Sequence, residues 1–114
     1  MVEVQYIPDE GDIVWLSFTG QQGHEQQGVR PALVLTPRLY NQYGLALVCP
    51  VTNKQKGYPF EVPILSFANA TTGVVLADQV KSIDWKSRTA TLKERANPVV
   101  VERVKDKILL LLGK

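Results

Sequence analysis

The chain has 114 residues, so we expect residues 1–114 to form one domain with a modest core. Its 45% hydrophobic and 21% charged residues are typical of a globular protein, and the formal net charge of +2 does not by itself argue for nucleic-acid binding. No signal segment is visible at the acidic N-terminus and no apolar run is long enough to span a membrane, so we expect a cytoplasmic protein without a membrane partner.

The first half of the chain predicts two strands around a polar loop. Residues 11–18 (GDIVWLSF) carry β-branched and aromatic side chains on both faces, which predicts a strand with one face in the core and the other partly covered. Residues 19–30 are polar, with three glycines, and loops of this length in compact domains tend to be functional. Residues 31–37 (PALVLTP) predict a buried strand between prolines, followed by a helical turn over residues 38–44 that ends at Gly44.

Short extended segments dominate the second half, and a polar basic loop over residues 53–57 separates the first two. Prolines in residues 58–64 suit an edge strand. Five bases between Lys81 and Arg95 make either a local basic face or a solvated strand edge. The predicted strands here are residues 45–52, 58–64, 73–80, 81–87 and 89–96.

The C-terminal segment predicts a helix. Asn97 suits an N-cap, Pro98 suits the first helical position, and Gly113 is a natural stop. Leu109 and Leu110 widen the apolar stripe, which favours a helix that also touches a second subunit over a frayed end. Six or seven strands and one helix indicate a mainly β (α+β) fold, a small partly open barrel with a C-terminal helix.

Several kinds of site are absent from the sequence. There is one histidine and no CxxC, HExxH, P-loop, GxGxxG or GxSxG pattern, so an enzyme of this sequence is expected to work without a metal or cofactor. Cys49 lies in an apolar run, which predicts a buried small hydrophobe in a reducing compartment and not a nucleophile.

The remaining candidates surround the polar loop. Arg30 offers forked donors that match phosphate oxygens, or it ties the loop to a carboxylate. His24, Glu25 and Gln26 are solvated loop residues or site residues. The Thr52 hydroxyl is available to a ligand or bonds the local backbone.

Four segments together carry a family pattern. In this order and spacing, with a C-terminal helix after them, they resemble the MazF/PemK family of toxin endoribonucleases, close to the founding MazF branch. The resemblance covers nearly the whole chain and implies an SH3-like barrel that forms a homodimer. The segments are GDIVWLSF (11–18), GHEQQGVRPALVL (23–35), CPVTNKQKGYPFEV (49–62) and GVVLADQVKSIDW (73–85).

The resemblance also implies an activity and two partners. The activity is metal-independent cleavage of single-stranded RNA, mainly mRNA, at short motifs. The 2′-hydroxyl of the substrate attacks, leaving a 2′,3′-cyclic phosphate and a 5′-hydroxyl end. A cognate antitoxin with an acidic, disordered tail is expected to block the RNA groove.

Residue roles carry over by motif. The resemblance implies that Arg30 of the RPA motif is central to catalysis and that Thr52 of the PxT motif lies near the scissile phosphate. Glu25 matches the EQ pair of the loop before the RPA strand. His24 stands where many members have Ser or Thr, and Ser17 and Thr19 stand where some relatives have acidic residues, so the recognised RNA sequence need not match theirs. The expected RNA-binding residues are Phe18, Thr19, Gln26, Asn53, Lys56, Gln79 and Lys81.

Chemistry divides the catalytic roles. Arg30 best stabilises the developing phosphorane charge, a contribution of about 3–4 kcal/mol for preorganised donors. A guanidinium pKa above about 12 makes Arg30 a poor proton carrier. We therefore expect His24, whose ordinary pKa is about 6.5, to act as the acid or base.

Two other functions compete with RNA cleavage. One is a gyrase-poisoning toxin of the same fold, which acts through an aromatic-containing C-terminal tail. This chain ends in LLLLGK, with no aromatic residue. The other is a non-catalytic small barrel that binds RNA or peptide, against which the presence of Arg30, Glu25 and Thr52 together argues.

Overall fold

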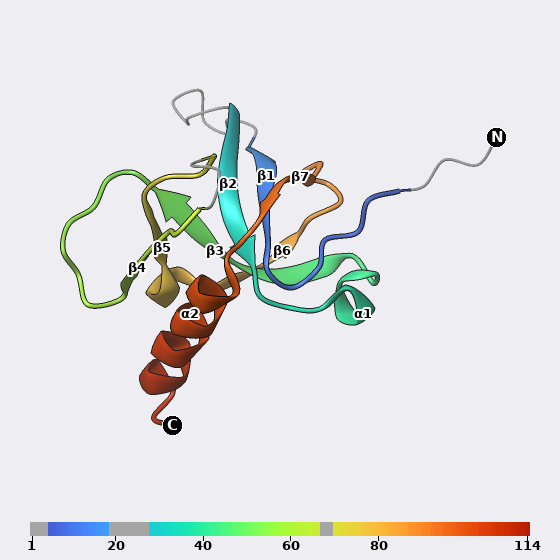
Figure 1. The fold of residues 1–114 in the computed structure, drawn as a ribbon. Coiled ribbons are helices and arrows are strands. Elements are labelled where there is room, and N and C mark those ends of the chain that lie inside the picture. Colours follow the sequence, from blue (N-terminus) through green and yellow to red (C-terminus); the bar gives the residue numbers. More distant parts are fainter. Residues whose placement is uncertain (1–4, 19–27, 67–69) are drawn as a thin grey trace, which may run out of the picture.

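The computed structural model describes residues 5–18, 28–66 and 70–114, except the side chain of Phe18 (Figure 1). These residues form one antiparallel sheet of seven strands, a short helix and a longer C-terminal helix. The elements are β1 (Asp12–Phe18), β2 (Gly28–Val34), α1 (Arg38–Asn41), β3 (Leu45–Thr52), β4 (Glu61–Pro63), β5 (Val74–Leu76), the 3₁₀ turn η1 (Ala77–Gln79), β6 (Lys81–Asp84), β7 (Thr91–Arg95) and α2 (Pro98–Leu111).

The strand β3 is shared between two parts of the sheet. The strand order is β4-β5-β3-β2-β1-β7, and β6 also pairs with β3. The first half of β3 pairs with β6, while its last two residues, Val51 and Thr52, pair with β5. Among the described strands no ladder joins β6 to β7, so the barrel stays partly open and the predicted architecture is confirmed.

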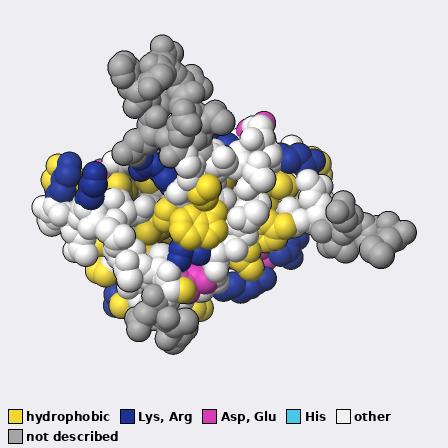
Figure 2. Space-filling view, turned by 90° about the horizontal axis from the view of Figure 1, so that it is seen from above, with side chains coloured by type: hydrophobic (Ala, Val, Ile, Leu, Met, Phe, Trp, Pro, Cys, Tyr) yellow, Lys and Arg dark blue, Asp and Glu magenta, His cyan; other side chains and the backbone are white. Residues whose placement is uncertain are grey.

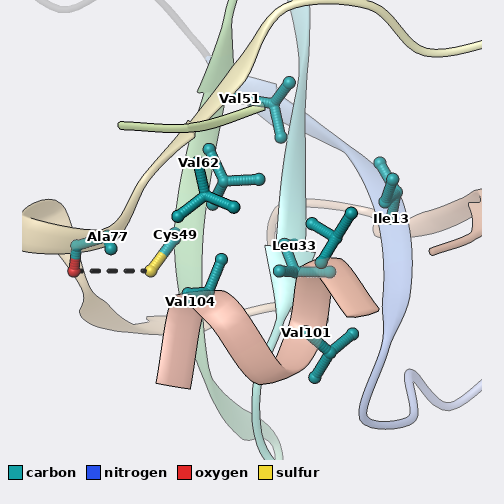
Figure 3. Close-up of a cluster of buried hydrophobic side chains, with 10 residues drawn as sticks. Ile13, Leu33, Cys49, Val51, Val62, Ala77, Val101 and Val104 are labelled. Atoms are coloured by element: carbon teal, nitrogen blue, oxygen red, sulfur yellow. Dashed lines mark hydrogen bonds between the residues drawn. The ribbon is translucent and has the colours of Figure 1, made fainter. Parts of the chain in front are cut away.

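Both faces of the central strands are buried, because side chains alternate across each strand. One face packs under α2, where Val100, Val101 and Val104 are buried (Figure 3). The sheet residues of this cluster are Ile13, Leu33, Cys49, Val51, Val62 and Val75, with Ala77 of η1. The opposite face forms a second cluster of Val14, Leu16, Ala32, Val34, Ala46, Val48, Ile83, Trp85 and Ala90.

Four predicted elements are confirmed. The strand over residues 45–52 has the predicted bounds, and the turn before it is helical at Arg38–Asn41 and ends at Gly44, whose φ is +108°. Helix α2 begins at Pro98, and the Asn97 side chain caps it by accepting from the Val99 N–H at 3.0 Å. The first strand is also as predicted, with Ile13 buried and Trp15 half-buried.

The polar loop is predicted to extend to residue 30, but a strand begins before that. Strand β2 begins at Gly28 and ends at Val34, so Arg30 lies inside a strand. Strand β2 begins early because β1 extends to Phe18. Ser17 pairs with Val29 and Phe18 pairs with Gly28, so the backbone groups of Gly28 and Val29 find partners in the sheet.

The strand predicted over residues 73–80 is wrong in its second half. It ends at Leu76, and Ala77–Gln79 form the 3₁₀ turn, so Gln79 is not on a strand. Strands β5 and β6 pair with the same edge of β3, so the chain must step from one to the other. The Ala77 N–H then donates to the Phe60 carbonyl at 3.0 Å, which fixes the turn.

Three other predicted strands are shorter than expected. Residues 58–64 pair only at Glu61–Pro63, at the sheet edge as predicted. Residues 81–87 pair only as far as Asp84, whose carboxylate accepts from the Ser87 N–H and starts a turn. Residues 89–96 pair only over Thr91–Arg95.

The segment before β1 is fixed by a buried carboxylate. Asp12 is fully buried and accepts from the Tyr6 hydroxyl at 2.5 Å and from the Asp9 N–H at 3.0 Å. Burial and this bond raise the pKa of Tyr6. Asp9 in turn accepts from the Arg38 N–H at 2.9 Å, so the segment also connects to α1. No helix in the described part of the chain is long and apolar enough to cross a membrane.

Candidate functional site

Arg30 has a fixed backbone and an exposed side chain. It pairs with Leu16 across β1 and β2, and its side chain reaches solvent. Two residues further along β2, Ala32 pairs with Pro50 of β3. Since alternate residues share a face, Arg30 and Thr52 lie at the same end and on the same face of the sheet. The two residues expected to contact the reacting phosphate thus share one end and one face of the sheet, just beyond the last pair of the β2–β3 ladder.

Thr52 is the last residue of β3, and its hydroxyl makes a hydrogen bond to the nearby backbone. The Thr52 Oγ1 atom accepts from the Lys54 N–H at 3.1 Å, the backbone bond considered from the sequence. A hydroxyl that accepts one bond still has its own proton to donate. Thr52 is half-buried, so it can offer this proton to an oxygen at the end of the strand.

Gly73 presses against the end of β3. Its φ is +100°, and a Cβ at this position would lie 2.2 Å from the Thr52 carbonyl oxygen and 2.8 Å from Asn53 Oδ1. Asn53 Oδ1 also accepts from the Thr72 hydroxyl at 2.8 Å. The chain before β5 therefore fixes both Thr52 and Asn53, and only glycine fits at residue 73.

The segment between β3 and β4 stands out from the sheet (Figure 1). The Glu61 carboxylate accepts from the Lys56 N–H at 2.9 Å and from the Gly57 N–H at 3.0 Å. Lys56 is exposed, and its Nζ lies 6.0 Å from the centroid of the Tyr58 ring, which is itself 55% exposed. The sequence prediction included Lys56 but not Tyr58 or Glu61, although every second residue here is first basic and then aromatic.

Lys81 lies at the rim of a hollow of about 450 Å³ beside the open edge of the barrel. The Ser17 N–H donates to the Arg88 carbonyl at 2.8 Å, which joins the turn after β6 to the end of β1. Asp84 is held in this turn by hydrogen bonds from Ser87, whose backbone N–H is the main cause of its lowered pKa. Two cations and three serine hydroxyls against one carboxylate, Asp84, leave the hollow slightly positive, which suits an anion. Its lining is Ser17, Lys81, Ser82, Ile83, Asp84, Ser87 and Arg88.

The sequence prediction did not include Arg88. It lies after a turn whose return to β1 depends on a contact between residues 17 and 88, far apart in the chain. Gln79, which was included, is exposed on η1, two residues before Lys81. Gln79 and Lys81 therefore both lie near the edge of β3 that faces β5 and β6.

Several predicted site residues lie outside the described residues: Thr19, His24, Glu25 and Gln26. The Phe18 backbone pairs with Gly28, and its side chain also lies outside the description. Their roles stay predictions. The face seen from above in Figure 2 has hydrophobic side chains at its centre, Lys and Arg at several places, and Asp and Glu at few.

Cys49 is confirmed as a buried small hydrophobe. Its side chain is fully buried, and the Sγ atom lies 3.9 Å from the Ala77 carbonyl oxygen (Figure 3). Burial raises the pKa of the Cys49 thiol to about 12, with a smaller contribution from Asp78. The thiol is therefore neutral at pH 7. Within the described ranges, no three His, Cys, Asp or Glu side chains gather in a way that could hold a metal ion.

Comparisons with known proteins agree over nearly the whole chain. A family profile described as PemK-like, MazF-like toxin of type II toxin-antitoxin system matches residues 9–112. The chain is 48% identical over 110 residues to the endoribonuclease toxin MazF of Escherichia coli strain K12, an alignment that covers 96% of this chain and 97% of the relative. It is 42% identical over 98 residues to the endoribonuclease toxin ChpB of that strain, with 82% and 84% covered. A crystal structure of MazE-MazF from Deinococcus radiodurans matches with a TM-score of 0.90 and 51% identity, and covers 96% of this chain and 98% of that chain.

Proposed function

The chain belongs to the family of PemK-like, MazF-like toxins of type II toxin–antitoxin systems, and from this we propose that it is an endoribonuclease that cleaves single-stranded RNA, mainly mRNA, at short motifs. The observation that carries the proposal is the 48% identity of the chain, over 96% of its length, to a protein named as an endoribonuclease toxin. The common end and face of Arg30 and Thr52 support it from the geometry. Residues 1–114 act as one toxin domain in the cytoplasm, where mRNA is available.

The reaction is a transesterification within the RNA that uses no metal. The 2′-oxygen of the substrate loses its proton and attacks the neighbouring phosphorus, and the bond to the 5′-oxygen breaks as that oxygen gains a proton. The products are a 2′,3′-cyclic phosphate and a 5′-hydroxyl end. Arg30 stabilises the charge on the phosphorane and Thr52 donates to a phosphate oxygen. His24 and Arg30 are the candidates for the acid or base, and Glu25 positions the substrate.

RNA is bound by the surfaces on either side of this pair. Asn53 and Lys56 follow Thr52, while Gln79 and Lys81 lie beside the next strands, with Lys81 on the polar hollow that also contains Arg88. Both surfaces carry cations that suit the RNA backbone. Phe18, Thr19 and Gln26, which come from the same stretch of sequence as His24 and Glu25, complete the set.

Two proteins are the partners. One is a cognate antitoxin whose acidic, disordered tail folds on the toxin and covers the RNA groove. A solved relative that is 51% identical is a MazE-MazF structure, which supports such a partner. The other is a second copy of this chain, since the end of α2 and the residue after it expose Leu109, Leu110 and Leu112 at 47%, 64% and 68%.

The test is RNA cleavage by the purified protein in excess chelator. Single-stranded RNA is incubated with the unmodified protein and with Arg30→Ala, and the products are separated on a denaturing gel. We expect site-specific cleavage by the unmodified protein and its loss in the variant. Intact RNA would overturn the proposal, and loss of cleavage in chelator alone would overturn its metal-independent part.

A further inference from the structure

The segment between β3 and β4 is a loop of fixed shape that presents a ring and two cations. We propose that Tyr58 and Lys56 form a subsite that stacks one base and pairs one phosphate of the RNA strand, and that Glu61 is the positioning residue that shapes it. The proposal rests on the proposed function and adds a substrate contact to it.

The carboxylate of Glu61 determines the course of the loop. It accepts two consecutive backbone N–H groups, from Lys56 and Gly57, at 2.9 and 3.0 Å. Its own N–H donates to the Tyr58 carbonyl at 3.2 Å, and its backbone pairs with Leu76 in β5. Glu61 therefore joins the tip of the loop to the sheet, and residues 56 and 58 present their side chains from a fixed backbone.

The beginning of the loop is fixed as well. The Lys54 N–H donates to Thr52 at 3.1 Å, and the Thr72 hydroxyl donates to Asn53 at 2.8 Å. A loop held at both ends has little conformational entropy left to lose on binding. Such order has no role in the hydrophobic core, since residues 53–59 are all exposed.

The Tyr58 side chain is exposed, and lysines lie near it in the same loop. The residue is 55% exposed, and the Lys56 ammonium lies 6.0 Å from its ring centroid. Lys54 is exposed in the same loop. A flat aromatic ring beside ammonium groups is the chemistry that binds single-stranded nucleic acid, because the ring stacks on a base and the cations meet phosphates. An acidic peptide would use the cations but would gain less from the ring.

The position also suits a substrate contact. Tyr58 is six residues after Thr52 in the chain, so the two lie within about 22 Å of each other even if the segment were fully extended. A strand whose phosphate lies at Thr52 can therefore reach Tyr58 within a few nucleotides. The subsite acts on binding and leaves the chemical step to Arg30 and Thr52.

The experiment measures kcat and KM for cleavage of a single-stranded RNA oligonucleotide. We expect Tyr58→Ala to raise KM about 10-fold with kcat unchanged, and Tyr58→Phe, which keeps the ring, to restore KM. Glu61→Gln should raise KM severalfold, also without a change in kcat. The matched control is Tyr43→Ala, since Tyr43 is a tyrosine exposed at 80% on the other side of β3 in the chain.

The outcomes separate the two proposals. Normal cleavage with an unchanged KM in Tyr58→Ala would overturn the subsite and leave the proposed function standing. No cleavage by the unmodified protein would overturn the proposed function, and the subsite with it. If Tyr58→Ala lost binding of an acidic peptide but kept its KM for RNA, the surface would belong to a protein partner and the subsite would be wrong. Circular dichroism checks that each variant is folded.

Discussion

At the scale of single residues, Arg30 combines a rigid backbone with an accessible side chain. The ladder to Leu16 holds its main chain, and the guanidinium remains exposed. The backbone position of Arg30 is therefore set before substrate arrives, and the side chain is accessible to it. In the proposed reaction the forked geometry is expected to matter as well as the charge, because two N–H groups can reach two oxygens of one phosphate.

The substitution Arg30→Lys tests the geometry separately from the charge. It keeps the cation and removes the fork, so we expect the cleavage rate to fall about 10²- to 10³-fold. The free energy of unfolding should change by less than about 0.5 kcal/mol, since the side chain is exposed. Single-turnover kinetics and urea unfolding measure the two quantities. Full activity in Arg30→Lys would show that charge alone suffices.

Gly73 gives a second prediction at this scale. Gly73→Ala places a methyl group against the Thr52 carbonyl at a positive φ, so we expect a loss of about 2 kcal/mol or more in the free energy of unfolding. Cleavage should weaken too, since Thr52 must shift. The control is Gly57→Ala, which has φ of +81° but nothing within 4 Å of the new Cβ, and should cost about 1 kcal/mol. Equal losses in urea unfolding of the two variants would contradict the steric argument.

At the scale of elements, local chemistry predicts some bounds and distant pairing decides the others. Helix α2 follows from its Asn97 cap and Pro98, and β3 follows from its apolar run. The early start of β2 and the turn at Ala77–Gln79 depend on partners in β1 and β3, which no local pattern reveals. The candidate site divides in the same way. Arg30 and Thr52 belong to motifs, whereas Arg88 reaches Ser17 only through the folded turn.

The junction between the first segment and α1 predicts a dependence on pH. Hydrogen bonds from the Arg38 N–H, chiefly, and from the Glu10 N–H lower the pKa of Asp9 below its usual 3.8. A carboxylate with a lowered pKa stabilises the fold above its ordinary pKa and loses this effect as pH falls through the lowered value. Asp9→Asn should therefore have a lower Tm than the unmodified protein at pH 6, and the difference should shrink as the pH falls below the ordinary pKa of Asp9. Calorimetry at several pH values measures the difference, and a constant gap at every pH would contradict this cause.

At the scale of the whole molecule, the first half of α2 is buried against the sheet and its end is exposed. Val100, Val101 and Val104 pack on the sheet, while the last turns expose Leu109 and Leu110. The first half of the helix covers the core, and the leucines at its end are exposed. Such exposed leucines suit an interface with a second copy of the chain. The proposed homodimer would cover these leucines.

Leu110→Glu tests this interface. The residue is 64% exposed, so the monomer fold should tolerate the charge, while a buried carboxylate at an interface should shift the protein to monomers. Sedimentation velocity measures the change. Leu92→Glu, on β7 and 45% exposed, is the matched control and should remain dimeric. A monomeric unmodified protein, or a Leu110→Glu dimer, would contradict the interface.

The central claim is that the attacking oxygen comes from the RNA itself. The most direct measurement compares a cleaved oligonucleotide with one that carries a single 2′-deoxyribose on the 5′ side of the cut bond, both in excess chelator. We predict that the all-ribose strand is cut to a 2′,3′-cyclic phosphate and a 5′-hydroxyl end, and that the substituted strand stays intact at that bond. Cleavage of the substituted strand at the same bond would contradict the account, because another nucleophile would then be attacking the phosphorus.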